Sequence, residues 1–122
     1  MTFESLGISK QLSEALQSQG ITTPFPIQEQ AIPLLLKGKH LLGIAPTGSG
    51  KTAGFVLPVL EKRQHTTYKN SRNIPVLILV PTRELAIQIE SFVKSCSPHL
   101  KRSVQSMAVY GGVAINPQMK NM

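Results

Sequence analysis

Residues 45–52, with the sequence Ala-Pro-Thr-Gly-Ser-Gly-Lys-Thr, are the residues best suited to chemistry. Gly48 and Gly50 let the backbone curl so that successive N–H groups point at phosphate oxygens, and a following helix adds its dipole. Lys51 would place a positive charge on the β- and γ-phosphates, and the Thr52 hydroxyl is a ligand for Mg²⁺. Spacing alone also fits a glycine-rich turn with a helix-capping Thr. The pattern predicts a nucleoside triphosphate site.

This predicted phosphate loop departs from the general P-loop pattern at one position, because Ala45 stands where that pattern has Gly. Lys51 and Thr52 are the candidate catalytic residues, and Thr52 is also the candidate metal ligand. The loop residues predicted to bind the nucleotide are Ala45, Thr47, Gly48, Ser49, Gly50, Lys51 and Thr52.

The neighbouring elements must place this loop between the end of a strand and the beginning of a helix. Apolar runs and helical spacing alternate along the chain, which indicates helices joining buried strands. Such helices imply a parallel sheet with right-handed crossovers, so we expect an α/β fold. We expect helices over 10–19 and 26–37 in a first region, 1–38, and a β-α-β-α-β core over 39–122. The expected core elements are a strand over 40–45, a helix over 51–63, a strand over 75–80, a helix over 83–95 and a strand over 103–110.

The composition limits the class of protein. The 122 residues make about one domain. Thirteen Lys and Arg against six Glu and no Asp give a net charge of +7. This charge suits a polyanionic partner such as nucleic acid, although many basic domains bind none. No apolar run is long enough to span a membrane and the first residues are not a signal peptide, so we expect a cytoplasmic protein without a membrane partner.

The cysteine and the histidines are expected to be structural. A single cysteine, Cys96, excludes an internal disulfide framework, and its place on the last turn of a predicted helix suits a small buried side chain. His40 is expected at the edge of a strand. His65 and His99 have no partner pattern and are expected to be solvated.

Four elements together carry a family resemblance. Residues 20–28, Gly-Ile-Thr-Thr-Pro-Phe-Pro-Ile-Gln, lie upstream of the phosphate loop, with Phe3 placed 17 residues before their first Gly. Residues 81–86, Pro-Thr-Arg-Glu-Leu-Ala, directly follow a predicted strand, and Gly111-Gly112 follow the last one. In this order they resemble the Q motif, motif Ia and GG element of DEAD-box RNA helicases. That family commonly has Ala at the position of Ala45.

The resemblance implies an adenine site beside the phosphate loop. Gln28 would read the adenine edge, since a side-chain amide can both donate to and accept from N6 and N7. Phe3 would pack on the base. For Gln28 the alternative is an exposed helix residue, and for Phe3 it is an aromatic side chain that fills the core.

The resemblance also implies RNA contacts. Arg83 and Thr82 would contact the RNA backbone, as expected for a sequence-tolerant binder. The alternative is a capped helix start with a solvated Arg, and for the glycine pair a plain turn. The residues assigned to RNA by the resemblance are Pro81, Thr82, Arg83, Gly111 and Gly112.

Two departures from the family pattern are visible. The Q motif usually has Ser or Thr where this chain has Phe25, so a hydroxyl that could cap the following helix is absent. The Asp-Glu-Ala-Asp segment, whose acids hold Mg²⁺ and position the attacking water, is also absent, because the chain has no Asp. We therefore expect an incomplete RecA-like P-loop NTPase domain that binds ATP and Mg²⁺ without turnover. It should expose a strand edge and apolar surface and have low stability.

Three functions fit these patterns to different degrees. The first is the ATP- and RNA-binding N-terminal part of a DEAD-box helicase, a family that couples ATP binding and hydrolysis to local RNA unwinding. The second is a stand-alone, non-catalytic module for nucleotide or RNA. A small P-loop kinase is disfavoured, because its Mg²⁺ and substrate sites normally need Asp. No oligomeric state is predicted.

Overall fold

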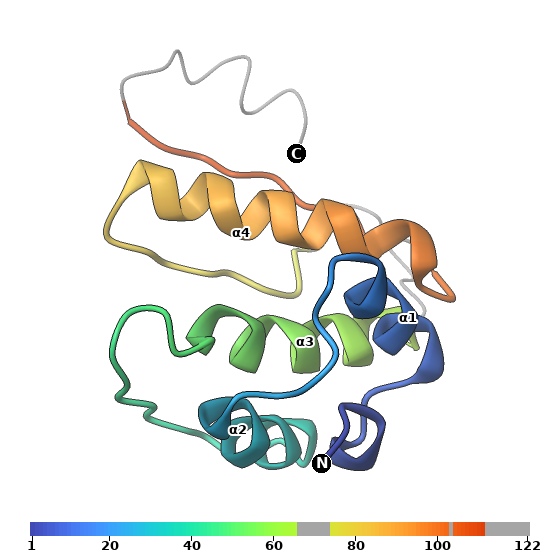
Figure 1. Cartoon of the computed structure of the whole chain (residues 1–122). Helices are drawn as coiled ribbons and strands as arrows, with labels where there is room; N and C mark the ends of the chain where they lie inside the picture. The colour runs from blue at the N-terminus through green and yellow to red at the C-terminus, as the bar shows by residue number, and fades with distance from the viewer. Residues whose placement is uncertain (66–73, 103, 112–122) are drawn as a thin grey trace.

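The protein is described by a computed structural model over residues 1–65, 74–102 and 104–111 (Figure 1). None of the helices in these ranges is long and apolar enough to cross a membrane. The elements, in chain order, are the short 3₁₀ helix η1 (Glu4–Leu6), α1 (Lys10–Ser18), α2 (Pro26–Leu36), α3 (Lys51–Gln64), α4 (Arg83–Cys96) and the 3₁₀ helix η2 (Ser97–His99).

The helix boundaries follow signals that the sequence displays. The Ser9 hydroxyl accepts a hydrogen bond from the N–H of Leu12 and so caps α1. Pro26 occupies the first turn of α2, where its missing N–H costs nothing, and Gly38, with a φ of +81°, follows the end of that helix. The four predicted helices are confirmed, each end to within one residue.

A hydrophobic core lies where α1, α3 and α4 meet. Its fully buried members include Leu12 and Leu16 from α1, Leu57 from α3 and Cys96 from α4. Each buried Leu side chain contributes roughly 1.5–3 kcal/mol relative to an exposed one. Cys96 is a small buried side chain, as expected, and burial raises the pKa of its thiol.

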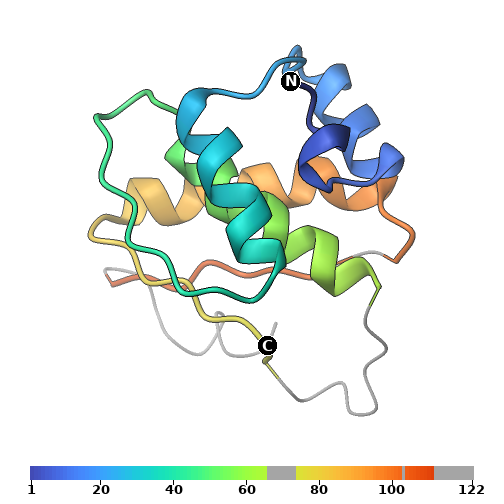
Figure 2. The ribbon, with the colours of Figure 1, turned by 90° about the horizontal axis from the view of Figure 1, so that it is seen from below.

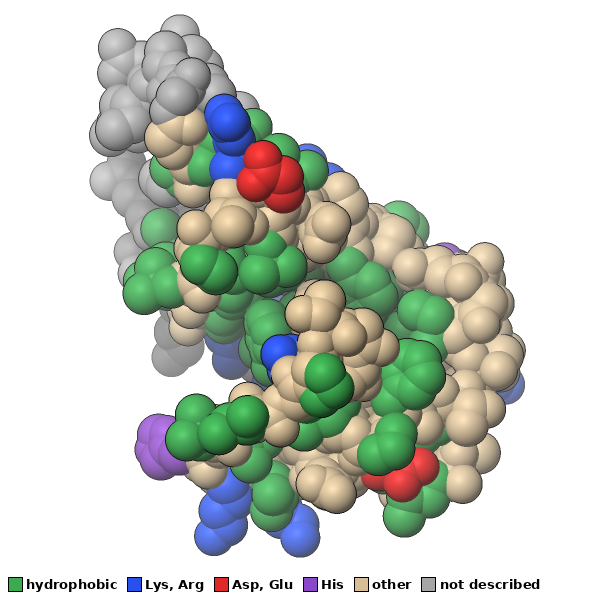
Figure 3. All heavy atoms as spheres, turned by 60° about the vertical axis from the view of Figure 1, so that its left-hand side comes forward, with side chains coloured by type: hydrophobic (Ala, Val, Ile, Leu, Met, Phe, Trp, Pro, Cys, Tyr) green, Lys and Arg blue, Asp and Glu red, His purple; other side chains and the backbone are tan. Residues whose placement is uncertain are grey.

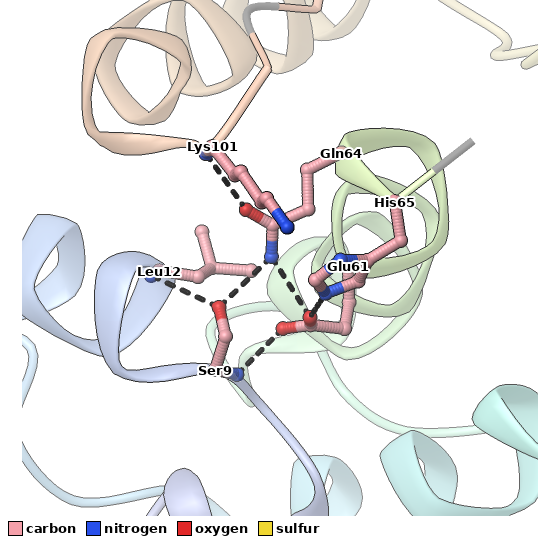
Figure 4. Close-up of polar contacts among 6 residues, drawn as sticks. All are labelled: Ser9, Leu12, Glu61, Gln64, His65 and Lys101. Carbon is pink, nitrogen blue, oxygen red and sulfur yellow. Dashed lines mark hydrogen bonds and ion pairs between the residues drawn. The ribbon is translucent and has the colours of Figure 1, made fainter. Parts of the chain in front are cut away.

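A buried polar network ties the end of α3 to the beginning of α1 and to the turn after η2 (Figure 4). Glu61 accepts hydrogen bonds from the Ser9 N–H at 2.6 Å and from Gln64 Nε2 at 2.8 Å. Gln64 also donates to the Ser9 hydroxyl and accepts from the Lys101 N–H. His65 is exposed, as expected, but its Nε2 lies 2.9 Å from a Glu61 oxygen, so the expectation that it has no partner was wrong. His99 is exposed, as expected.

The predicted strand segments run as extended chain beside the helices. In both ribbon views, residues 40–45, 75–80 and 104–110 run in the same direction (Figures 1 and 2). The described residues contain no β-strand, so the predicted parallel sheet is not confirmed, and Ser103 lies outside these residues. Leu42, Ile44, Leu77 and Leu79 are between 78% and 86% exposed. A buried parallel strand needs a covered face on each side, and these side chains lack that cover.

Candidate nucleotide-binding site

Three candidate segments gather at one end of the molecule. The phosphate loop and the beginning of α4 each follow one of the extended segments. Both lie toward the left of Figure 1, as does the end of the third extended segment, residues 104–110. Figure 2 places them toward the same side. In parallel α/β proteins, ligands bind at the carboxyl ends of the strands. The candidate residues lie at the corresponding ends of the extended segments, although the described part of the chain forms no sheet there.

The phosphate loop has the backbone geometry that its two glycines permit. Gly48 and Gly50 have φ values of +85° and +88°, a region that residues with a Cβ rarely adopt. The Ser49 N–H donates to the Pro46 carbonyl at 3.2 Å, which closes the turn. Gly50 is the N-cap of α3 and supplies no side-chain acceptor. The first N–H groups of α3 are therefore available to an anion in front of the helix.

The polar side chains of this loop fit a polyphosphate. Lys51 is exposed and donates to the carbonyl of Ala45, which leaves two of its N–H groups for a ligand. The Ser49 hydroxyl is buried and has no hydrogen-bond partner in the described part of the chain. Thr52 is half-buried at the first turn of α3, and Thr47 is exposed.

A magnesium ion would find one candidate ligand from the chain here, the Thr52 hydroxyl. Within residues 1–65, 74–102 and 104–111, no three His, Cys, Asp or Glu side chains gather to hold a metal. Mg²⁺ commonly keeps several waters and takes other oxygens from substrate phosphates. The residues present thus suit a phosphate-bound ion, whose chemistry is to neutralise phosphate charge.

Gln28 joins this loop from the beginning of α2. Its Oε1 accepts from the Phe25 N–H at 2.9 Å, and its Nε2 donates to the Gly50 carbonyl at 3.0 Å. Gln28 is only 3% exposed, so the alternative of an exposed helix residue was wrong. Its amide retains a second N–H and a second lone pair that these contacts do not use.

A cavity lies between the helices and the extended segments, next to the loop. Its volume is about 410 Å³ and its walls are mainly apolar, with Lys51 and Thr52 at one side. Figure 3, which brings this end of the molecule forward, shows hydrophobic side chains around a hollow. The turn 46–50 is not part of its lining, and phosphates need N–H groups rather than alkyl walls. The cavity therefore borders the candidate phosphate site at Lys51 and Thr52 without including the turn itself, and no sequence pattern pointed to it.

Comparison with known proteins decides the family. The family model described as DEAD/DEAH box helicase matches residues 25–122. The chain belongs to this family. It is 45% identical over 119 residues to the probable ATP-dependent RNA helicase ddx27 of Dictyostelium discoideum, covering 96% of this chain and 15% of that one. It is 41% identical to the ATP-dependent RNA helicase DeaD of Escherichia coli, covering 98% and 18%.

Solved structures of DEAD-box proteins show the fold. A DEAD box protein from Methanococcus jannaschii has 38% identity and a TM-score of 0.77, over 99% of this chain and 32% of that one. The helicase Prp28 from Chaetomium thermophilum, bound to ADP, has 38% identity and a TM-score of 0.82, over 97% and 28%. The chain therefore has part of the P-loop NTPase-like fold of DEAD-box helicases. It spans between 13% and 23% of the length of the curated relatives.

Phe3, the aromatic residue upstream of the DEAD-box Q motif, lies in the core. It is 2% exposed and belongs to the same buried cluster as Leu57 and Leu60 of α3. This is the position that the core-filling alternative expects. Contact between Phe3 and an adenine base stays a prediction.

The segment that resembles motif Ia forms the beginning of α4. The Thr82 hydroxyl accepts from the Leu85 N–H at 3.2 Å, so it caps the helix, as the alternative of a capped helix start expects. Pro81, Thr82, Arg83 and Gly111 are exposed. These residues are accessible to a strand of RNA, while their contact with RNA stays a prediction. Gly112 lies outside the described residues.

Glu90 holds the last extended segment of the described residues against α4. Its carboxylate pairs with Lys94 and accepts a hydrogen bond from the Ala108 N–H. The hydrogen bond from Lys94, more than that from Ala108, holds the pKa of Glu90 below its ordinary value of 4.5, although partial burial acts in the opposite direction. The hydrogen bond therefore ties Ala108, in the last extended segment, to Glu90 of α4.

Proposed function

We propose that the chain is the ATP- and RNA-binding part of a DEAD-box RNA helicase. The observation that carries the proposal is the hydrogen bond from Gln28 Nε2 to the Gly50 carbonyl, 22 residues away in sequence. It places the side chain suited to reading adenine directly against the loop suited to binding phosphates. In the larger protein, ATP binding and hydrolysis at this site would drive local separation of RNA duplexes.

The nucleotide roles follow from the chemistry of each group. The free hydrogen-bonding positions of Gln28 read adenine, and Phe3 supports the base. The loop, from Ala45 through Thr47, Gly48, Ser49 and Gly50, receives the phosphates on its N–H groups. Lys51 places its charge on the β- and γ-phosphates, and Thr52 supplies a ligand to Mg²⁺.

RNA binds across the exposed end of the molecule. Its backbone contacts Arg83 and Thr82, with Pro81 and the Gly111-Gly112 pair providing close backbone approach. The chain alone binds ATP without turnover, because no Asp is present to position the attacking water. An ATPase rate near ~1 s⁻¹, with or without RNA, would contradict this statement.

Calorimetric titration with Mg²⁺ and ADP tests the proposal. Lys51→Ala should weaken ADP binding by roughly tenfold or more, because a hydrogen bond to a charged group contributes about 1.5–3 kcal/mol. Lys39→Ala, an exposed lysine outside the loop, removes the same charge and should leave binding nearly unchanged. Equal losses in the two variants, or no ADP binding by the unmodified chain, would refute the proposed site.

A further inference from the structure

Phe25 is an exposed aromatic residue that touches the phosphate loop. It is the N-cap of α2, its side chain forms no capping hydrogen bond, and it is 53% exposed. A methyl group placed on Gly50 would lie 2.6 Å from Phe25 Cδ2 and 2.5 Å from Gln28 Nε2. One edge of the phenyl ring therefore lies against the backbone of Gly50.

Gly50 is held on three sides by these contacts. Its carbonyl accepts hydrogen bonds from Gln28 Nε2 at 3.0 Å and from the Gly54 N–H at 3.2 Å. The ring of Phe25 covers its Cα. Phe25 makes a second contact: its N–H donates a hydrogen bond to Gln28 Oε1. This bond orients the Gln28 amide so that its nitrogen faces Gly50.

We propose that Phe25 is a positioning residue that braces the phosphate loop through its ring. The inference rests on the proposed function and adds to it a residue at which this chain departs from the Q-motif pattern. The ring limits the backbone of Gly50 to its φ of +88° and thereby fixes the direction of the N–H groups that follow. Phe25 touches no phosphate itself. A loop already fixed in its binding shape loses less entropy when a ligand binds.

Three substitutions separate this brace from a general structural role. Phe25→Ala should weaken binding of inorganic pyrophosphate about three- to tenfold, because the loop loses its cover. Phe25→Tyr keeps the ring and should bind like the unmodified chain. Phe25→Thr supplies a hydroxyl that can cap α2, so its urea midpoint should equal or exceed that of the unmodified chain, while pyrophosphate binding still falls. Leu34→Ala, which shortens a partly exposed side chain on α2, is the matched control.

Nuclear magnetic resonance on the labelled full chain gives both readouts. Pyrophosphate titration measures affinity, and amide hydrogen exchange without ligand measures the Gly54 N–H bond to Gly50. Faster Gly54 exchange in Phe25→Ala and Phe25→Thr, but not in Phe25→Tyr or Leu34→Ala, supports the brace. This result holds even if pyrophosphate fails to bind. A failure to bind would contradict only the proposed function. Unchanged Gly54 exchange in both ring-deleted variants, or affinity that follows the urea midpoint, would overturn the brace.

Discussion

Gln28 is suited both to holding the phosphate loop and to reading a base, because a neutral amide carries both a donor and an acceptor. Its buried position costs little, since Oε1 and Nε2 each have a backbone partner, Phe25 and Gly50. A carboxylate of the same length would lose the donor to Gly50 and bury a charge. The residue type therefore follows from the contacts, whether or not a base is bound.

Gly50→Ala should destabilise the chain more than Gly48→Ala. Both positions have positive φ, so each Ala should cost about 1–2 kcal/mol of strain. At Gly48 an added Cβ meets nothing within 4 Å, whereas at Gly50 it meets Gln28 and Phe25. We expect an additional loss of roughly 1–3 kcal/mol for Gly50→Ala from this crowding. Urea unfolding of both variants measures the difference, and equal losses would show that Gly50 has no such neighbours.

The sequence predicts the role of a residue well when its partners are close in sequence. It predicts the role poorly when the partners are far away in sequence. The loop from Gly48 to Lys51 was predictable because its glycines and charge act within one turn. The contact between His65 and Glu61 joins residues only four apart in sequence. It was still not predicted, because Glu61 is held in place by Ser9, which is 52 residues away. The core position of Phe3 depends likewise on side chains from α3. The spacing of residues along the chain does not indicate such distant partners.

The helices and the strands differ in how well the sequence predicts them. A helix bonds within itself, so Ser9, Pro26 and Thr82 mark real boundaries of α1, α2 and α4. A parallel strand depends on neighbours brought together by long connections. The apolar run 75–80 is read easily as a strand, yet its pairing depends on other segments, and among the described residues it is extended chain without strand pairing.

The contact between α4 and residues 104–110 should weaken in acid. Lys94 and the Ala108 N–H hold the folded-state pKa of Glu90 below its ordinary value of 4.5. The folded chain then binds fewer protons than the unfolded one, so this contribution to stability is present above about pH 4.5 and disappears as pH falls through the lower, folded-state pKa. Glu90→Gln should therefore flatten this part of the acid decline in urea midpoint.

Glu14→Gln is the control for this pH dependence. Glu14 is exposed on α1, so its replacement should leave the acid decline as it is in the unmodified chain. Urea midpoints at about pH 6 and pH 3 span the relevant range. Identical declines for Glu90→Gln and the unmodified chain would show that the ion pair does not support the folded state.

The described part of the molecule has one well-packed layer of helices and one side on which large apolar side chains are exposed. The helices share a buried core, whereas the extended segments expose large apolar side chains such as Leu42, Ile44 and Leu77. This agrees with the expectation of exposed apolar surface. Extended chain outside a sheet, with exposed apolar side chains, invites pairing with another copy.

The isolated chain should therefore associate and unfold easily. We expect a free energy of unfolding below ~5 kcal/mol and a mass that rises with concentration. Replacing Ile44 and Leu77 together by Lys should reduce the association without lowering stability, because both side chains are exposed. Sedimentation velocity and urea unfolding provide the measurements. A clean monomer with a sharp transition at ~5 kcal/mol or more would contradict this account and favour a stand-alone binding module.

The central claim is that Gln28 and the phosphate loop form one adenine nucleotide site. Calorimetric comparison of ADP with GDP tests it most directly, because the two ligands share their phosphates and differ in the base edge. We predict that ADP binds roughly tenfold or more tightly, and that Gln28→Ala removes this preference while lowering both affinities. Lys51→Ala should lower both and keep the preference. Equal affinities for ADP and GDP in the unmodified chain would contradict the claim.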